Sequence, residues 1–172
     1  MPAPAIGKEA VVRQILGVLS EAFNGPPEHW SYFTDTAADA GLFGTLAKIA
    51  ASDACRVLGR TTIAAHVNHI LFSMHASSRW IEGDRTTHSW DESWSVSRVD
   101  EASWDLLRDR LKVAYIDVRR AIELFAFASE EAMGGVMGAL AHLAYHLGAI
   151  RQKVSIIASS LPEGSAGIDT HK

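Results

Sequence analysis

The stretch SEEAMGGVMGALAHLAYHLGAIRQKVSIIA, residues 129–158, decides the fold class of this chain. Its apolar residues recur every three or four positions, which is the period of a buried helix face, and Glu130 and Glu131 suit a helix N-terminus. The segment therefore predicts a long core helix. Its glycines each cost such a helix on the order of 1 kcal/mol relative to alanine, so we expect neighbouring backbone to approach closely there. These glycines are Gly134, Gly135, Gly138 and Gly148.

Three other stretches show the same three- and four-residue spacing: residues 8–23, 61–80 and 103–127. Nowhere does the sequence sustain the two-residue alternation that is typical of a half-buried strand. The chain is therefore predicted to be all-α. We expect one helical domain, residues 1–160, followed by a flexible tail, residues 161–172.

Two segments between the long helices have a weaker pattern. Residues 35–58 are expected to contain an extra short helix, capped by Asp35 or Thr36. Residues 82–103 are rich in charged residues, serine and threonine and contain two tryptophans, so a long ordered loop is predicted there.

Charge and hydropathy exclude two classes of partner. Lys and Arg number 16 against 20 Asp and Glu, and the net charge of −4 gives no basic excess for binding nucleic acid. The sequence shows no apolar run near the roughly 18 residues of a membrane span, and its N-terminus lacks a basic-then-apolar signal pattern. We expect a soluble, cytoplasmic protein with no nucleic-acid or membrane partner.

The cysteine content narrows the chemistry further. Cys55 is the only cysteine, which excludes an intrachain disulfide, a CxxC redox pair and a multi-thiolate zinc site. We interpret it as a small buried thiol. Metal or acid–base chemistry would then have to use His, Asp and Glu.

Histidine is the unusual signal. Five of the eight histidines fall in two predicted helices, and His142 and His146 are four residues apart, so both imidazoles can reach one cation on a shared helix face. One such pair is a weak indication by itself, because a histidine on an apolar helix is more often a hydrogen-bonded core residue. The other three, on the second long helix, are His66, His69 and His75.

A third ligand could come from the second long helix if an antiparallel bundle places it opposite the last one. With Ile63 as the centre of the apolar stripe, His66 lies about 60° away and His69 about 120° away, which favours His66 slightly and leaves both open. No HExxH motif and no pair of ExxH motifs occurs, so a zincin protease and a ferritin-like di-iron site are disfavoured. A mononuclear site remains.

The segments TIAAHVNHI, residues 62–70, and AHLAYHLGAIRQ, residues 141–152, resemble those of the DinB/YfiT-like metal-binding four-helix bundles. The resemblance covers most of the chain, including the Trp-rich WDESW, residues 90–94, and VDEASW, residues 99–104. It implies an antiparallel four-helix bundle with an extra short helix and a long Trp-rich loop.

The resemblance also implies one divalent metal held by three histidines. We expect a transition metal, with zinc or nickel favoured, and an all-imidazole site also accepts copper or iron. The first ligand of the family stands about six residues after the aliphatic residue that opens its helix and directly before another aliphatic residue. Here that position is His69, which follows Ile63 by six residues and precedes Ile70, so the resemblance selects it over His66. The implied metal site is His69, His142 and His146. Several members carry an arginine after the final ligand where this chain has Leu147, so a role for that arginine does not transfer.

Some relatives are thiol-dependent, so the resemblance implies a metal-dependent thiol S-transferase or hydrolase-type enzyme acting on a small molecule or a low-molecular-weight thiol. A homodimer is expected too, since dimers are common in the family. The alternative is a non-catalytic metal-binding or dimerisation bundle with a stress-related role.

Catalytic residues are not identified by the sequence. The acidic and histidine side chains after the second long helix are interpreted as surface groups: Asp84, His88, Asp91 and Glu92. Tyr145 is interpreted as a packing residue. Arg151 and Gln152 could touch an anionic ligand, but we favour a helix-end cation that complements the helix dipole.

Overall fold

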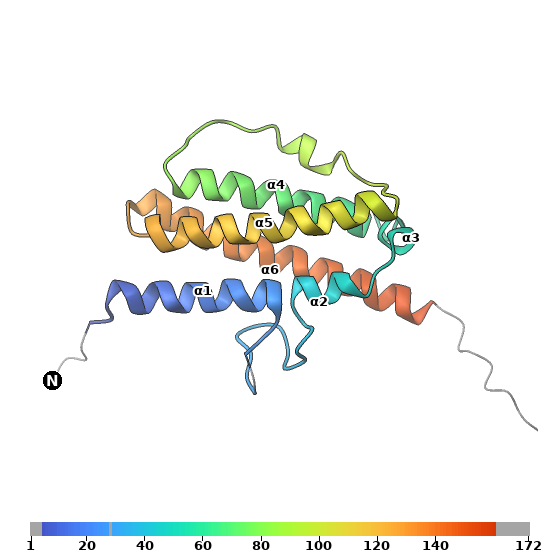
Figure 1. Ribbon diagram of the computed structural model, residues 1–172, viewed down its shortest axis with the longest axis horizontal. Helices are drawn as coiled ribbons and strands as arrows, with labels where there is room; N and C mark the ends of the chain where they lie inside the picture. The colour runs from blue at the N-terminus through green and yellow to red at the C-terminus, as the bar shows by residue number, and fades with distance from the viewer. Residues whose placement is uncertain (1–4, 28, 161–172) are drawn as a thin grey trace, which may run out of the picture.

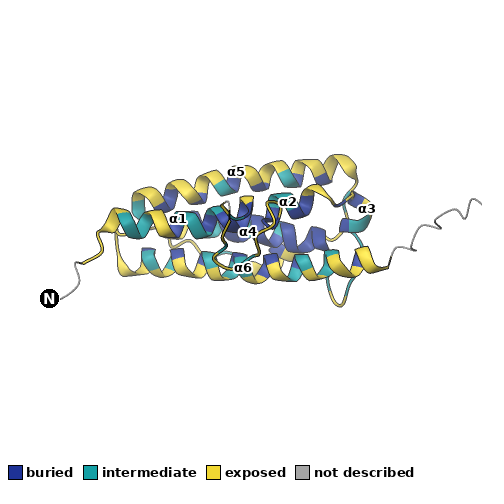
Figure 2. Cartoon of the chain, turned by 90° about the horizontal axis from the view of Figure 1, so that it is seen from below, coloured by how far each residue is buried: buried dark blue, intermediate teal, exposed yellow. Residues whose placement is uncertain are grey.

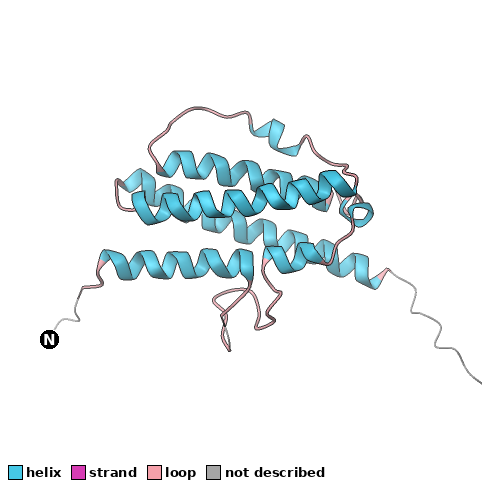
Figure 3. Ribbon diagram, in the orientation of Figure 1, coloured by secondary structure: helices cyan, strands magenta, loops and turns pink. Residues whose placement is uncertain are grey.

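The computed structural model of the protein describes residues 5–27 and 29–160, and every regular element in these ranges is a helix (Figure 3). The all-α prediction is thus confirmed. The predicted tail, residues 161–172, lies outside the described residues. The long helices are α1 (Lys8–Asn24), α4 (Ile63–Ile81), α5 (Glu101–Phe125) and α6 (Glu130–Ser159).

Three of the long helices begin at a side chain that accepts a hydrogen bond from the backbone N–H three residues further on. Each such cap satisfies a donor that the helix itself leaves unpaired, and is worth about 1 kcal/mol. The caps are Thr62, Asp100 and Ser129, whose N–H partners are Ala65, Ser103 and Ala132 at 3.1, 2.8 and 3.1 Å.

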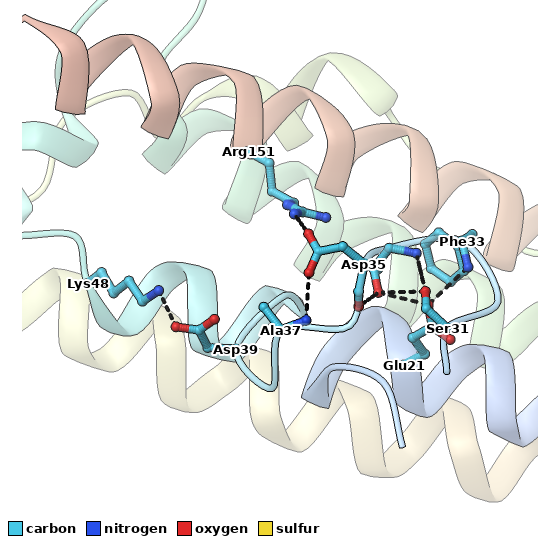
Figure 4. Close-up of polar contacts among 9 residues, drawn as sticks. Glu21, Ser31, Phe33, Asp35, Ala37, Asp39, Lys48 and Arg151 are labelled. Carbon is cyan, nitrogen blue, oxygen red and sulfur yellow. Dashed lines mark hydrogen bonds and ion pairs between the residues drawn. The ribbon is translucent and has the colours of Figure 1, made fainter. Parts of the chain in front are cut away.

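The shorter elements differ from the prediction of one extra helix capped by Asp35 or Thr36. Two short helices follow α1, namely α2 (Leu42–Ala47) and α3 (Ala51–Ala54), and the Trp-rich connection contains a 3-10 turn, η1 (Trp90–Trp94). Asp35 caps no helix because its carboxylate accepts the N–H of Ala37, two residues on, at 2.8 Å (Figure 4). Such a bond closes a local turn.

Figure 1 shows α1 and α6 running in one direction along the long axis of the molecule, and α4 and α5 in the other. Trp80, at the end of α4, donates its indole N–H to the carbonyl of Glu131 at the start of α6, 3.1 Å away. Trp104, at the start of α5, donates to the carbonyl of Ile49, before α3 and α4, at 2.8 Å. Thus α4 is antiparallel to α6, as expected, whereas α4 and α5 run parallel.

The connection between α4 and α5 explains this topology. Residues 82–100 return along the outside of the helices, from the end of α4 to the start of α5 (Figure 1). The connection has about as many residues as α4 itself, and an extended residue spans about twice the rise of a helical one, so the return is easily made. A short turn would have forced an antiparallel neighbour.

The core is built from the inward faces of the long helices, visible as dark stripes in Figure 2. α4 is the most enclosed of them, because α5, α6 and η1 all pack against it. The largest side chains in the core are fully buried: Trp104, Phe23, Leu111 and Ile122. Polar side chains on α4 are therefore held in fixed positions by their surroundings.

α6 is long and apolar enough to span a membrane by length and composition alone. This differs from the prediction that no run approaches that length. The finding is weak evidence for a span, because the core helix of a soluble protein passes the same test. The inward face of α6 contributes Val136, Leu143 and Ile150 to the core.

Candidate metal centre

His69 of α4 and His142 and His146 of α6 lie together, with their Nε2 atoms directed at one another. His142 Nε2 is 3.0 Å from His69 Nε2 and 2.8 Å from His146 Nε2, and the three possible ligand atoms all lie within 4.8 Å. The four-residue spacing on α6 puts His142 and His146 on one helix face, and the antiparallel packing of α4 brings His69 to it. The three residues that the resemblance implies are thus close together.

These distances fit a divalent cation. When two imidazole nitrogens bind one ion, each metal–nitrogen distance is about 2.0–2.1 Å. The two nitrogens are then roughly 2.8–3.4 Å apart if the nitrogen–metal–nitrogen angle lies between a right angle and the tetrahedral angle. A proton on His142 Nε2 can serve only one of its two nitrogen neighbours at a time, whereas a cation attracts all three lone pairs. The three histidines could therefore hold a metal ion, and an all-imidazole set does not select which one.

Each of the three rings is held from behind through its Nδ1 atom. His69 Nδ1 lies 2.6 Å from Ser93 Oγ, and that hydroxyl donates to the carbonyl of Trp90 at 2.5 Å, so Ser93 accepts from His69 Nδ1–H. This fixes the tautomer in which His69 Nε2 carries a lone pair. The other two contacts permit the same tautomer: His142 Nδ1 with Ser73 Oγ at 2.6 Å, and His146 Nδ1 with His66 Nδ1 at 3.0 Å.

Burial keeps these histidines neutral. It lowers the pKa of His69 to about 4 and that of His146 to about 3, with a further contribution from the neighbouring histidines. Burial also lowers the pKa of His142. The pKa of His66 is lowered to about 4 by burial and, to a smaller extent, by nearby Lys153. Neutral imidazole is the form that binds a metal, so the site is ready for one near neutral pH without the loss of protons.

The Trp-rich connection covers one side of the cluster. The ring of Trp94 stacks on His69 with the centroids 4.0 Å apart and the planes 17° from parallel, and Trp90 lies at an angle 6.2 Å from His142. Asn68 of α4 anchors the connection by donating to the carbonyl of Ser93 at 2.7 Å. His69 and His146 are buried while His142 is half-buried, so a ligand approaches from the His142 side.

His66, which the stripe geometry slightly favoured, contacts His146 from behind instead of joining the group. The angle from Ile63 did not predict the ligand correctly because α4 is buried on several sides. A small angle from the centre of the apolar stripe therefore does not show which neighbouring helix a residue faces. Neither serine behind the rings was singled out from the sequence. Ser73 was detectable in principle, since it lies one helical turn after His69 on the same face. Ser93 carries no comparable signal.

The acidic candidates lie away from the cluster. Asp84 accepts hydrogen bonds from Arg79 at 2.8 Å and from the hydroxyl of Thr86 at 2.6 Å, while Asp91 and Glu92 are exposed. Across residues 5–27 and 29–160, no carboxylate joins the three histidines in a metal-binding group. The site therefore consists of imidazoles alone.

Two interpretations of α6 residues need correction. Tyr145, expected to pack, is 71% exposed and touches only the edge of the site through the ring of His146, 5.0 Å away. Arg151, expected to complement the helix end, instead forms an ion pair with Asp35 in the loop after α1 (Figure 4). Gln152 is exposed.

The glycines of α6 also differ from expectation. A side chain added at Gly135 would meet the indole of Trp80 at 2.6 Å, so a close approach occurs there, but to a side chain and not to backbone. At Gly134, Gly138 and Gly148 an added Cβ would meet nothing within 4 Å. These three glycines leave space open along the helix.

Replacing Ser93 by alanine is expected to weaken metal binding about 10- to 100-fold, because His69 Nδ1–H loses its acceptor and the ring loses its fixed orientation. Competition with a chelator of known affinity measures the effect. Ser95→Ala, at an exposed position in the same connection, serves as the control. Equal affinities in the two variants would show that Ser93 does not position His69.

Comparisons of the chain with protein-family models, with curated proteins and with solved structures find no match. The functional argument consequently rests on the geometry of the three histidines and of the residues around them.

Proposed function

We propose that this protein is a DinB/YfiT-like helical bundle that binds one divalent transition metal through His69, His142 and His146 and catalyses thiol S-transfer or hydrolysis on a small molecule. The observation that supports this most is the convergence of three Nε2 atoms whose rings are each held through Nδ1. A metal bound by three neutral imidazoles keeps its full charge and an open position, where it lowers the pKa of a coordinated water or thiol.

The residues of the chain have separate tasks in this proposal. Ser93, Ser73 and His66 hold the three rings so that little reorganisation is needed on metal binding. Trp94 covers His69 and keeps water from that side. Access is left at half-buried His142, and no general base is assigned, because no carboxylate reaches the histidines in the described ranges.

Turnover of a thiol tests the enzymatic part. The metal-loaded protein is expected to conjugate a low-molecular-weight thiol, such as a mycothiol-like or bacillithiol-like compound, to chlorodinitrobenzene, with chloride leaving and the thiol proton passing to solvent. The rate should be at least about tenfold above that of the chelator-treated protein, since the metal raises the thiolate fraction. Rates that do not depend on the metal, with every thiol tried, would contradict a transferase.

The second candidate is a non-catalytic metal-binding bundle, favoured because no carboxylate among the described residues joins the three histidines. Full metal occupancy without turnover would support it. The homodimer stays a prediction, for which three exposed apolar residues on one face of α5 offer a contact surface: Leu106, Val113 and Leu124.

A further inference from the structure

A groove with a volume of about 690 Å³ lies between α4 and α6, beside the start of the connection that follows α4. On α6 its lining extends from Glu131 to His142, and on α4 from Trp80 to Ser73. Since a helix rises 1.5 Å per residue, the groove is on the order of 16 Å long. One end is therefore formed by His142, the accessible histidine of the metal cluster.

The floor of the groove is open because it carries almost no side chains. Gly134 and Gly138 of α6 both line it, and a Cβ added at either would meet nothing within 4 Å. Opposite them α4 contributes the small residue Ala76. This places two of the helix-weakening glycines where they keep a channel open to the metal site.

The walls are aromatic. Trp90, near His142, is 48% exposed, and Trp80, at the far end, is 41% exposed. Trp80 is held in place by its bond to the Glu131 carbonyl and by the guanidinium of Arg85, 4.1 Å from the ring centroid. A ligand can bury these rings without first having to order them.

The two ends of the groove differ in charge. At the far end, beside Trp80, the charged side chains are paired with one another, whereas the near end, beside His142, adjoins the proposed cation site. Asp84 is bonded to Arg79, and Arg85 lies close enough to Glu131 to help lower the pKa of that carboxyl. Because these charges are paired, the far end of the groove favours an uncharged part of a ligand. At the near end, the cation site beside His142 favours an anionic donor atom.

We propose that this groove is the substrate site, and that it takes an elongated molecule with an uncharged aromatic or alkyl body and a single anionic donor group at one end. The donor lies beside His142, and the body extends over Gly138 and Gly134 toward Trp80. The position of the donor group depends on the proposed function, because it requires a metal bound by His69, His142 and His146. The fit of the body rests on the groove alone.

Filling the groove tests the proposal. Gly138→Leu inserts a side chain into open space within the groove, while Gly148→Leu does so on the same helix outside it. Both variants gain helix propensity, so both should fold. The probes are 4-phenylbutane-1-thiol, ethanethiol and 4-phenylbutan-1-ol, titrated into the full chain loaded with cobalt(II).

Phenylbutanethiol is expected to bind at least about tenfold more tightly than ethanethiol to the unmodified chain and to Gly148→Leu, because its body buries apolar surface. In Gly138→Leu this advantage should disappear. Equal affinity of the two thiols for the unmodified chain, or the same loss in both variants, would overturn the groove proposal.

The alcohol tests the groove independently of the metal chemistry, because it has the same phenylbutyl body but no thiol. It should shift the indole N–H resonances of Trp80 and Trp90 in the unmodified chain and in Gly148→Leu, but not in Gly138→Leu, whether or not a metal is bound. If neither thiol produces the sulfur-to-cobalt charge-transfer band, the proposed thiol chemistry fails, and the alcohol still decides the groove. An absence of indole shifts in the unmodified chain would count against the groove even with a normal cobalt band.

Discussion

Replacing His142 by alanine should lower the metal content of untagged protein from about one divalent ion per chain to nearly none, with a loss of affinity above about 100-fold. His142 Nε2 is the nitrogen that lies within 3.0 Å of both other Nε2 atoms, so its removal leaves His69 and His146 without the ligand that links them. Elemental analysis of protein purified without a nickel column, then dialysed against a buffer with limiting zinc, measures the content.

His75→Ala is the matched control, since His75 lies on α4 but is exposed and outside the cluster. Its metal content should equal that of the unmodified protein, and circular dichroism should show the same helix content for both variants. Retention of metal by His142→Ala would refute the three-histidine site. A comparable loss in His75→Ala would mean that binding is adventitious.

Sequence spacing could predict one half of the site and not the other. The pair His142 and His146 follows from helical geometry, because residues four apart share a face whatever the surroundings. The choice between His66 and His69 depends on which way α4 is rotated relative to α6, and that is decided by packing over the whole bundle. Only the resemblance pointed to His69, and the structure places that residue in the cluster.

The fold shows the same division between local and long-range information. The caps Thr62 and Ser129 were predictable, because a cap depends on a few adjacent residues. The parallel course of α4 and α5 was missed, although the length of the connection 82–100 was a usable signal. The open space at Gly138 was not predictable, since it depends on what other helices leave uncovered.

A buried carboxylate on α1 escaped the sequence analysis altogether. Glu21 is fully buried and accepts hydrogen bonds from the backbone N–H groups of Tyr32, Phe33 and Thr34 at 2.6, 3.0 and 2.9 Å. It also accepts one from the hydroxyl of Ser31 at 2.7 Å, and Figure 4 shows the contacts with Ser31 and Phe33. Burial alone would raise the pKa of Glu21, but these bonds outweigh it and lower the pKa to about 2. The carboxylate thereby fixes the loop after α1.

Substituting Glu21 by glutamine should therefore destabilise the protein by about 3 kcal/mol at pH 7, a large share of the stability of a typical domain. A lowered pKa stabilises the fold fully above the unfolded value of 4.5, and this contribution is lost as the pH falls toward 2. The difference in unfolding free energy between the two proteins should hence shrink by about 2 kcal/mol from pH 7 to pH 3 in urea titrations.

Glu9→Gln, at an exposed position of the same helix, should change the unfolding free energy by less than about 0.5 kcal/mol at either pH. If the Glu21 variant were equally destabilised at pH 7 and pH 3, the effect would come from the shape of the side chain and not from its charge. Since the charge is what orders the N–H groups of residues 32–34, the loop should also exchange its amide hydrogens faster in the Glu21 variant, while the core amides of α5 keep their protection.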